Sequence, residues 1–322
     1  MYDICALGEL LIDFTPAGIS DEGRPLFEQN PGGGPANVAA CIARLGRSSA
    51  YIGKVGSDPF GRSLISTLRS FGVEVKGVKT TGFYPTTLAF ITLDENGERS
   101  FNFFRNNTAD LRLTPGEVDM SLIDEAQVFC FGSVSMTGEP CCSATLSAAE
   151  YAKNADKVVC FDPNIRLALW ENDLVARDSC LRALQYTDIL KLSLEELSFL
   201  TQGMNLHDGA LTLLKRHNLD AVIVTRGEKG AYALTLSYEI SVPAYQVKTI
   251  DTTGAGDAFL GGLLYRMLGF GKRPEKLSNA EMMLSLDFAS AVGAMVTVRR
   301  GAMTALPTLD EVYECMRKTV KE

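Results

Sequence analysis

The sequence predicts an α/β fold in which a central, mostly parallel sheet lies between two layers of helices and carries a small β-sheet lid. From about residue 125 onward, short apolar runs alternate with helix-like stretches, which is the pattern of βαβ units on a parallel sheet. Two segments, 9–30 and 74–112, instead hold short alternating runs typical of antiparallel strands. The length of 322 residues suits one large domain with a small attachment.

The elements of the main layer follow in chain order. The run YDICALG near the N-terminus predicts a buried strand and not a signal peptide, because the stretch MYDICALGELLIDF lacks a basic segment and carries acidic residues inside its apolar run. Helical spacing of apolar residues predicts the first two helices at 34–46 and 58–71. Four buried strands are then predicted at 128–132, 157–162, 188–192 and 221–225, with helices between them at 140–154, 170–186, 194–201 and 208–217.

The lid is predicted to come from two separate parts of the chain. Segment 74–112 contains TLAFITLDENGERSFNFF, with a turn signal at Asn96–Gly97. Segment 9–30 supplies the remaining strands. No repeat, low-complexity tract or linker-like run interrupts the sequence, so residues 1–322 are predicted to form a single lidded domain.

Composition excludes several classes of function. The net charge is −8 and no lysine or arginine stripe is present, which argues against nucleic acid and anionic membranes as partners. No stretch approaches eighteen apolar residues, so no membrane span is expected. None of the eight cysteines forms a CxxC pair, which favours buried thiols in a reducing cytoplasm. With two histidines in the chain, acid–base chemistry is expected from carboxylates.

The first candidate site is the stretch PGGGPANVAACIARLG at 31–46. Glycines without side chains permit a ligand to approach the backbone closely, and Asn37 offers both a donor and an acceptor. A plain glycine-rich turn with a helix cap is the alternative interpretation. A dinucleotide site fits poorly, because the spacing is not GxGxxG and no strand immediately precedes it.

Two further candidates follow predicted strands, where open parallel sheets bind their ligands. FDPNIR places Asp162, Asn164 and Arg166 at the carboxyl end of a predicted strand, although a simple Asp-Pro-Asn turn is an alternative explanation for these residues. KLSLEEL places Glu196 after the next strand, as a candidate member of a hydrated metal network. Acidic residues also open many helices for reasons of the helix dipole.

The fourth candidate is DTTGAGDA at 251–258, just before a long apolar run. If Gly254, Ala255 and Gly256 present N–H groups at a helix N-terminus, they form an anion hole. Asp257 would then be a base beside a phosphoryl site, able to accept the proton of an attacking hydroxyl. The alternative is an acid that only stabilises the helix dipole.

Together these four stretches resemble the ribokinase/PfkB family of carbohydrate kinases. PGGGPANVAACIARLG is similar to the first family signature and DTTGAGDAF to the second, more than two hundred residues apart and in the expected order. The resemblance runs from Gly8 to Pro307. It implies a ribokinase-like three-layer α/β/α body with a β-lid, ATP as phosphoryl donor, Mg²⁺, and often a K⁺ site.

Within the family the sequence most resembles fructokinases, on SFNFFRNNTADLRL, FGSVS, FDPNIRLALW and RRGAMTALPT. This resemblance implies transfer of phosphate to the 6-hydroxyl of D-fructose, with Asp257 as the base and Arg166 neutralising phosphate charge. The residues implied to hold sugar hydroxyls are Asp13, Gly33, Asn37 and Arg105.

The resemblance also implies a nucleotide site and two metal sites. Glu196 is expected to bind Mg²⁺ through water. The nucleotide residues implied are Asn164, Ser193, Thr225, Gly227, Gly230, Gly254, Ala255, Gly256 and Ser290. A monovalent-cation loop is implied by Asp251, Thr253, Val296, Arg299 and Gly301.

The sequence departs from the family pattern at Ser193, Phe104, Ser290 and Ala305. Ser193 replaces the usual asparagine of an N-x-x-E motif, and Phe104 replaces a tyrosine on the sugar side. Ser290 replaces an asparagine near the adenine, and Ala305 offers no side-chain oxygen to a cation. A 2-keto-3-deoxygluconate kinase is therefore kept as an alternative, and a non-catalytic sugar sensor as one from another class. The resemblance also allows a homodimer through the lid.

Overall fold

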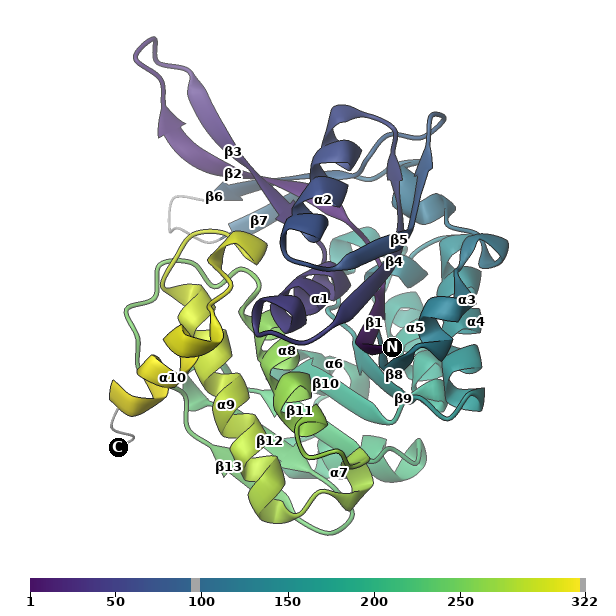
Figure 1. Cartoon of the computed structure of the whole chain (residues 1–322), viewed down its shortest axis with the longest axis vertical. Coiled ribbons are helices and arrows are strands. Elements are labelled where there is room, and N and C mark those ends of the chain that lie inside the picture. Colours follow the sequence, from purple (N-terminus) through teal and green to yellow (C-terminus); the bar gives the residue numbers. More distant parts are fainter. Residues whose placement is uncertain (94–98, 319–322) are drawn as a thin grey trace.

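The computed structural model describes residues 1–93 and 99–318. In this part of the chain the main sheet has nine strands in the order β13-β12-β11-β10-β9-β8-β1-β4-β5 (Figure 1). Pairing is parallel from β5 to β11, and the edge strands β12 and β13 run antiparallel. The strands are β1 (Tyr2–Leu7), β4 (Ser49–Gly56), β5 (Glu74–Thr81), β8 (Ala126–Gly132), β9 (Val158–Asp162), β10 (Ile189–Ser193), β11 (Ala221–Thr225), β12 (Ala231–Leu234) and β13 (Glu239–Val242).

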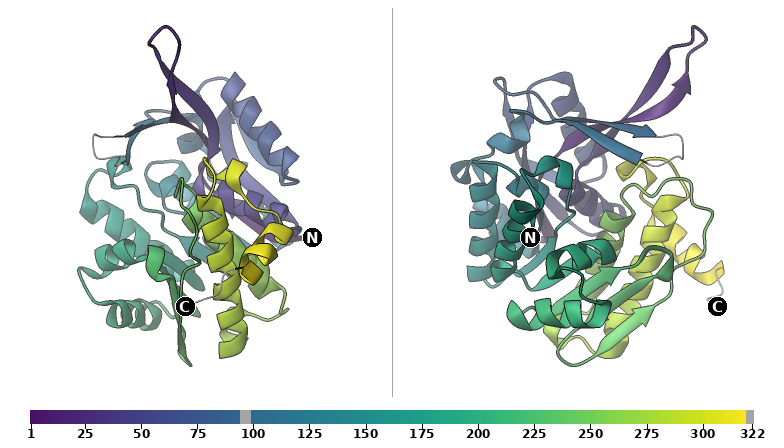
Figure 2. Two further views of the ribbon diagram at one scale, coloured as in Figure 1. Left: turned by 90° about the vertical axis from the view of Figure 1, so that its left-hand side faces the viewer. Right: turned by 180° about the vertical axis from the view of Figure 1, so that it is seen from behind.

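Helices cover both faces of this sheet (Figure 2). In β1, Ile4 and Ala6 belong to one hydrophobic cluster, while Cys5 and Leu7 belong to the other, because successive side chains of a strand point to opposite faces. The first cluster includes residues of α1 (Gly34–Arg44), α2 (Pro59–Ser70), α8 (Ala255–Leu268), α9 (Asn279–Thr297) and α10 (Leu309–Lys318). The second includes α3 (Met120–Asp124), α4 (Cys141–Asn154), α5 (Asp173–Ala183), α6 (Leu194–Thr201) and α7 (Leu206–Arg216). The predicted three-layer architecture is confirmed.

A second sheet of four strands lies above the main body, in the order β3-β2-β6-β7. Its strands are β2 (Leu11–Ile19), β3 (Pro25–Gly32), β6 (Leu88–Leu93) and β7 (Arg99–Phe104). They come from both predicted lid segments. The sheet is mixed, since β2 pairs with β6 in parallel. The predicted turn at Asn96–Gly97 lies outside the described residues.

The prediction that the whole of 74–112 lies outside the main sheet is wrong at its start. β5 pairs in parallel with β4 and forms the edge of the main sheet. Its alternating burial, with Val75 and Gly77 inward, is what any half-buried strand shows, so the pattern could not say which sheet it joins.

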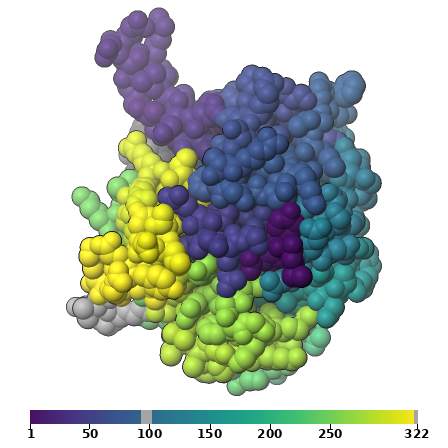
Figure 3. Space-filling view, viewed as in Figure 1, coloured from purple at the N-terminus to yellow at the C-terminus, as the bar shows by residue number. Residues whose placement is uncertain are grey.

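The hairpin of β2 and β3 extends away from the body, as Figures 1 and 3 show. Its outer end carries three exposed apolar side chains, Ile19, Leu26 and Phe27. The inner ends of the same strands return to the body, where Ile12 and Gly32 are buried. The hairpin therefore links an exposed tip to the carboxyl end of β1, after which β2 begins.

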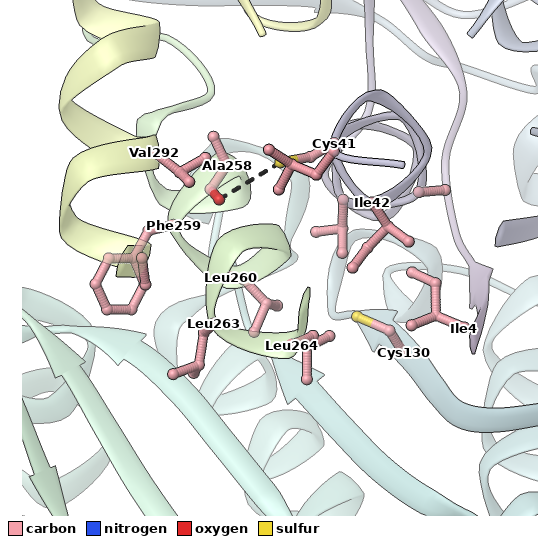
Figure 4. Packing of buried hydrophobic residues seen from close by; sticks show 14 of the residues in the cluster. Ile4, Cys41, Ile42, Cys130, Ala258, Phe259, Leu260, Leu263, Leu264 and Val292 are labelled. Atoms are coloured by element: carbon pink, nitrogen blue, oxygen red, sulfur yellow. Dashed lines mark hydrogen bonds between the residues drawn. The ribbon is translucent and has the colours of Figure 1, made fainter. Parts of the chain in front are cut away.

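Helices α1 and α8 pack closely enough to require small residues (Figure 4). The Cys41 thiol lies 3.6 Å from the Ala258 carbonyl oxygen. A Cβ on Gly261 would lie 2.7 Å from the Cys41 side chain, closer than real contacts allow. All eight cysteines are buried free thiols, as the sequence predicts. This close approach brings the first turns of the two helices together.

Of the described helices, α9 has the length and apolar composition to cross a membrane. Most of it is buried, and it packs against α8 and β13. The core helix of a globular domain has these properties, and the apolar character of α9 is explained by this packing.

Candidate active site

The polar segments that the sequence singles out gather at the carboxyl ends of the parallel strands. β9 ends at Asp162, just before Asn164 and Arg166. Glu9, which was not among the predicted site residues, follows β1. β10 ends at Ser193 and β11 at Thr225. Because these strands are parallel, their carboxyl ends lie at one edge of the sheet, where ligands bind in open α/β sheets.

Asp257 lies in the first turn of α8, buried beside α1. Gly254 caps the helix with φ of 76°, a left-handed conformation that glycine adopts readily. The Asn37 side-chain amide donates a 2.8 Å hydrogen bond to Oδ2 of Asp257. The Ala255 N–H donates to the Thr252 carbonyl at 3.2 Å. The prediction that Ala255 supplies a donor is therefore not supported, because its N–H already has a partner. N–H groups of a first helical turn have no partners within the helix, which leaves those of Gly254 and Gly256 as the predicted donors to an anion.

Two cavities meet at this turn. The lid-side cavity, about 70 Å³, is lined by Glu9, Leu11, Asp13, Gly33, Gly34, Asn37, Phe103, Val134, Asn164, Arg166, Thr253, Gly254 and Asp257. The large cleft, about 360 Å³, is lined by Thr225, Gly227, Glu228, Gly230, Ala244, Tyr245, Gln246, Val247, Thr249, Thr252, Ala255, Gly256, Phe259, Ser290, Gly293, Ala294 and Thr297. Consecutive residues of one helical turn thus form a wall of both.

The lid-side cavity is acidic. Its charged lining residues are Glu9, Asp13 and Asp257 against one guanidinium, Arg166. Burial raises the pKa of Asp13 to about 7, with Arg166 lowering it and Asp257 raising it. Burial also raises the pKa of Asp257, while Lys191, Asn37 and Arg166 lower it. A carboxylate whose pKa is raised is a stronger base and is better suited to accept a proton.

Gly33 is required by its backbone. Its φ is 121°, and a Cβ there would lie 2.2 Å from the carbonyl oxygen of Glu9. The neighbouring Gly34 begins α1, and a Cβ on it would lie 2.7 Å from the Asn164 amide nitrogen. The glycine stretch therefore lets three chain segments meet at the lid-side cavity, which supports the predicted reason for these glycines.

A buried ion pair lies directly behind the first turn of α8. The Lys191 ammonium is 2.7 Å from Asp162, and both side chains are less than a tenth exposed. A Cβ on Gly256 would lie 2.9 Å from the same nitrogen. Burial lowers the pKa of Lys191, but Asp162, Glu196 and Asp257 raise it by more, so the net shift is upward and the amine stays charged. This cation lies beside the predicted anion hole.

The large cleft contains most of the predicted nucleotide residues. Thr225, Gly227, Gly230 and Ser290 line it, together with Ala255 and Gly256. Gly230 has φ of 82°, and a Cβ there would lie 2.0 Å from the Val242 carbonyl. Asn164 lies elsewhere, in the lining of the lid-side cavity.

Ser193 and Glu196 form a capping box at the start of α6. One Glu196 oxygen accepts from the Ser193 N–H at 2.8 Å, and the other from the Ile165 N–H at 2.7 Å. Each oxygen keeps lone pairs for a water molecule. In residues 1–93 and 99–318, no three His, Cys, Asp or Glu side chains gather into a metal cluster. Mg²⁺ commonly relies on water and substrate phosphates with one or two carboxylates, which fits a single Glu196.

The predicted cation loop is held together by Asp251. Its carboxylate accepts from the Thr253 N–H at 2.8 Å and from the Gly301 N–H at 3.0 Å. The Arg299 N–H donates to the Val296 carbonyl at 3.4 Å. The arrangement brings the chain before α8 next to the chain after α9, as the cation interpretation requires.

Arg105 lines neither the lid-side cavity nor the large cleft, although it contacts Val134 in the lining of the former. Its guanidinium donates to Asp110 at 2.7 Å, to the Thr137 hydroxyl at 2.5 Å and to the Val134 carbonyl at 2.9 Å. It lines a neighbouring cavity on the other side of Phe103. Its role in holding a sugar stays a prediction, and the contacts it makes are those of a structural ion pair.

Sequence reasoning missed two residues of this site, Glu9 and Lys191. Glu9 directly follows a predicted strand, and that position is itself a signal for a ligand site. Lys191 sits within an apolar strand, where a lone charge is a signal for a buried partner. Neither signal identifies the group that the side chain contacts.

Comparisons with known proteins agree with this geometry. The profile of the pfkB family carbohydrate kinases matches residues 1–309. Fructokinase-1 of Zea mays is 42% identical over 318 residues, covering 98% of each chain. The crystal structure of fructokinase with bound ATP from Xylella fastidiosa has a TM-score of 0.89 at 31% identity, covering 99% of each chain. A fructokinase double mutant from Vibrio cholerae O395, in fructose, ADP and potassium ion bound form, has a TM-score of 0.87 at 34% identity and covers 98% of each chain.

These matches span nearly the whole chain and agree with its ribokinase-like architecture of a nine-stranded sheet with a four-stranded lid. The similarity extends over nearly the full length and is one of sequence as well as of fold, which supports membership of the same family. With both signatures placed at one pair of adjoining cavities, the chain belongs to the pfkB family of carbohydrate kinases.

Proposed function

We propose that this enzyme transfers the γ-phosphoryl group of ATP to the 6-hydroxyl of D-fructose. The observation that carries the proposal is the shared first turn of α8, which borders both cavities. A nucleotide in the large cleft and a sugar in the lid-side cavity would meet at this turn. Phosphoryl transfer depends mainly on positioning and on donors for the developing charge.

Asp257 is the proposed base. Its carboxylate would take the proton of the attacking hydroxyl as the oxygen–phosphorus bond forms and ADP leaves. Asn37 holds the carboxylate in place. In the N-terminal turn Gly254–Ala255–Gly256, the N–H groups of Gly254 and Gly256 would be donors to the phosphoryl oxygens, and Arg166 would supply positive charge from the lid-side cavity.

The donor side is proposed to hold ATP with Mg²⁺. Thr225, Gly227, Gly230 and Ser290 line the large cleft in which the nucleotide would lie. Glu196 would hold the ion through water, as its remaining lone pairs allow. When bound, the ion neutralises charge on the phosphates. A monovalent cation at the Asp251 loop is also proposed, and a Vibrio cholerae O395 fructokinase has been solved with potassium bound.

The acidic lining of the lid-side cavity favours a neutral sugar over a sugar acid. A carboxylate placed among Glu9, Asp13 and Asp257 would have Arg166 as its cation in the lining, and burying an unpaired charge is strongly unfavourable. We expect kcat/KM for fructose to exceed that for 2-keto-3-deoxygluconate by at least ~10-fold, or about 1.4 kcal/mol. A coupled ADP-release assay with both acceptors measures this ratio, and ³¹P NMR of the product identifies the phosphorylated hydroxyl.

Equal or reversed preference would reject fructose and favour the ketodeoxygluconate kinase, with the phosphoryl-transfer chemistry unchanged. Absence of turnover with any sugar, despite sugar binding, would favour a non-catalytic sensor. Asp257 and the donors beside it are the groups that a sensor would not need.

A homodimer through the lid is proposed on the exposed tip of the β2–β3 hairpin, where Ile19, Leu26 and Phe27 are solvent-exposed. Exposed apolar patches mark interaction surfaces. Light scattering during size-exclusion chromatography should give a dimer mass for the wild type, and a monomer mass for a Leu26→Glu, Phe27→Glu variant. A monomeric wild type at micromolar concentration would contradict the proposal.

A further inference from the structure

Glu9 is a buried acid with a fixed backbone, directly after β1. It is 4% exposed. The hydroxyl of the buried Tyr51 lies 2.8 Å from its carbonyl oxygen, and Gly33 approaches the same oxygen so closely that no side chain fits there. The position of Glu9 is therefore set by the core and not by a flexible loop.

The two carboxylate oxygens of Glu9 differ in their surroundings. Oε1 accepts a 2.7 Å hydrogen bond from the Gly34 N–H, at the start of α1. Oε2 is buried and has no hydrogen-bond partner among the described residues. A buried polar atom without a partner is costly in a native protein and rare. A ligand that completes the bond would account for it.

Only one other carboxylate oxygen in the described part of the chain shares this condition, Oδ1 of Asp162. That carboxylate already pairs with Lys191 through its other oxygen, and it does not line the lid-side cavity. Glu9 does line it. Of these two carboxylates, Glu9 is therefore the one in the lining of the lid-side cavity, where the side-chain oxygen Oδ1 of Asn37 is also without a partner among the described residues.

Glu9 also lies near the base. Glu9 Oε1 and Asp257 Oδ1 are each 3.6 Å from the point where a Cβ on Gly34 would stand. The two oxygens are thus at most twice that distance apart, a separation that one hexose can span. A sugar with one hydroxyl at Asp257 can present another to Glu9.

We propose that Glu9 binds the sugar directly, with Oε2 accepting a hydrogen bond from a hydroxyl other than the one that is phosphorylated. Oε1 meanwhile holds the first turn of α1, the helix that carries Asn37. The inference rests on the proposed function of the lid-side cavity as the acceptor site. It makes Glu9 a determinant of specificity, because a site built to bond a hydroxyl rejects an analogue that lacks it.

The variant Glu9→Gln separates the two roles. Its amide oxygen can still accept from Gly34, while an N–H donor replaces the oxygen that faces the sugar. Because the replacement leaves a buried sugar hydroxyl without its acceptor, the sugar KM should rise about 10- to 100-fold. The ATP KM and the melting temperature should stay close to those of the wild type. A sugar KM within twofold of the wild type would overturn the proposal.

The matched control is Asp58→Asn. Asp58 also accepts a backbone N–H at the start of a helix, from Gly61 at 2.8 Å in α2, but it lines neither cavity. This variant should lose stability and keep the wild-type sugar KM. If Glu9→Gln does not fold, Glu9→Asp, which withdraws the carboxylate by one methylene, is measured in its place with the same expected rise.

A cycle with deoxy sugars tests the contact itself. The acceptors are 1-deoxy-, 3-deoxy- and 4-deoxyfructose, or the matching deoxy forms of whichever sugar the wild type phosphorylates. With the wild type, one deoxy analogue should have a kcat/KM about 10- to 100-fold below that of the parent sugar. With Glu9→Gln, the same analogue should differ little from the parent sugar, because the contact is already lost. If, for every analogue, the effects of Glu9→Gln and of the missing hydroxyl on kcat/KM were fully additive, the proposed role of Glu9 would be overturned. Failure of the proposed function is seen separately, as absent fructose turnover by the wild type.

Discussion

Replacement of Asp257 by Asn should lower kcat by about 10²–10⁴, the usual contribution of a general base. Asparagine keeps the size of the side chain, and its oxygen can still accept the hydrogen bond that Asn37 now donates to Asp257. The melting temperature and the ATP KM should therefore change little. In the wild type, kcat should fall as the pH is lowered through the raised pKa of Asp257, because only the ionised form accepts a proton.

The matched control is Asp220→Asn, a partly buried acid far from both cavities whose pKa burial raises to about 6. Steady-state kinetics of both variants at saturating sugar and ATP make the comparison. Turnover by Asp257→Asn above about a tenth of the wild-type rate would show that the base is another group.

Replacement of Lys191 by Met should destabilise the fold by about 3–5 kcal/mol, because it leaves the buried carboxylate of Asp162 without its cation. That loss is a large share of the total stability of a typical domain. Urea unfolding measures it. Adding Asp162→Asn to the same chain removes the unpaired charge, so the double variant should recover part of the lost stability.

A surface pair provides the comparison for this effect. Lys272 lies 2.7 Å from Glu281, but its side chain is 45% exposed. Lys272→Met should cost less than about 1 kcal/mol, as for other exposed ion pairs. If the two lysine variants lost similar, small amounts of stability, Lys191 would not be acting as the partner of a buried charge.

The sequence alone determined the layered α/β architecture, both family signatures and the residue proposed as the base. Each of these depends on a local pattern. Short apolar runs that alternate with helix-like stretches indicate parallel strands, and glycines before an apolar helix predict an N-terminal anion hole. The resemblance carried by PGGGPANVAACIARLG and DTTGAGDAF then indicated the chemistry, and the family was confirmed.

Tertiary structure decided what depends on contacts between distant segments. β5 joined the main sheet because its partner is β4, a choice that its own alternation leaves open. Asn164 came to the lid-side cavity because Gly34 leaves room for its amide. Asn37 and Asp257, 220 residues apart in sequence, are joined because Cys41 and Gly261 let two helices approach. Glu9 and Lys191 are recognised as candidate site residues by their burial and by the groups that they contact. Neither property can be read from the sequence pattern alone.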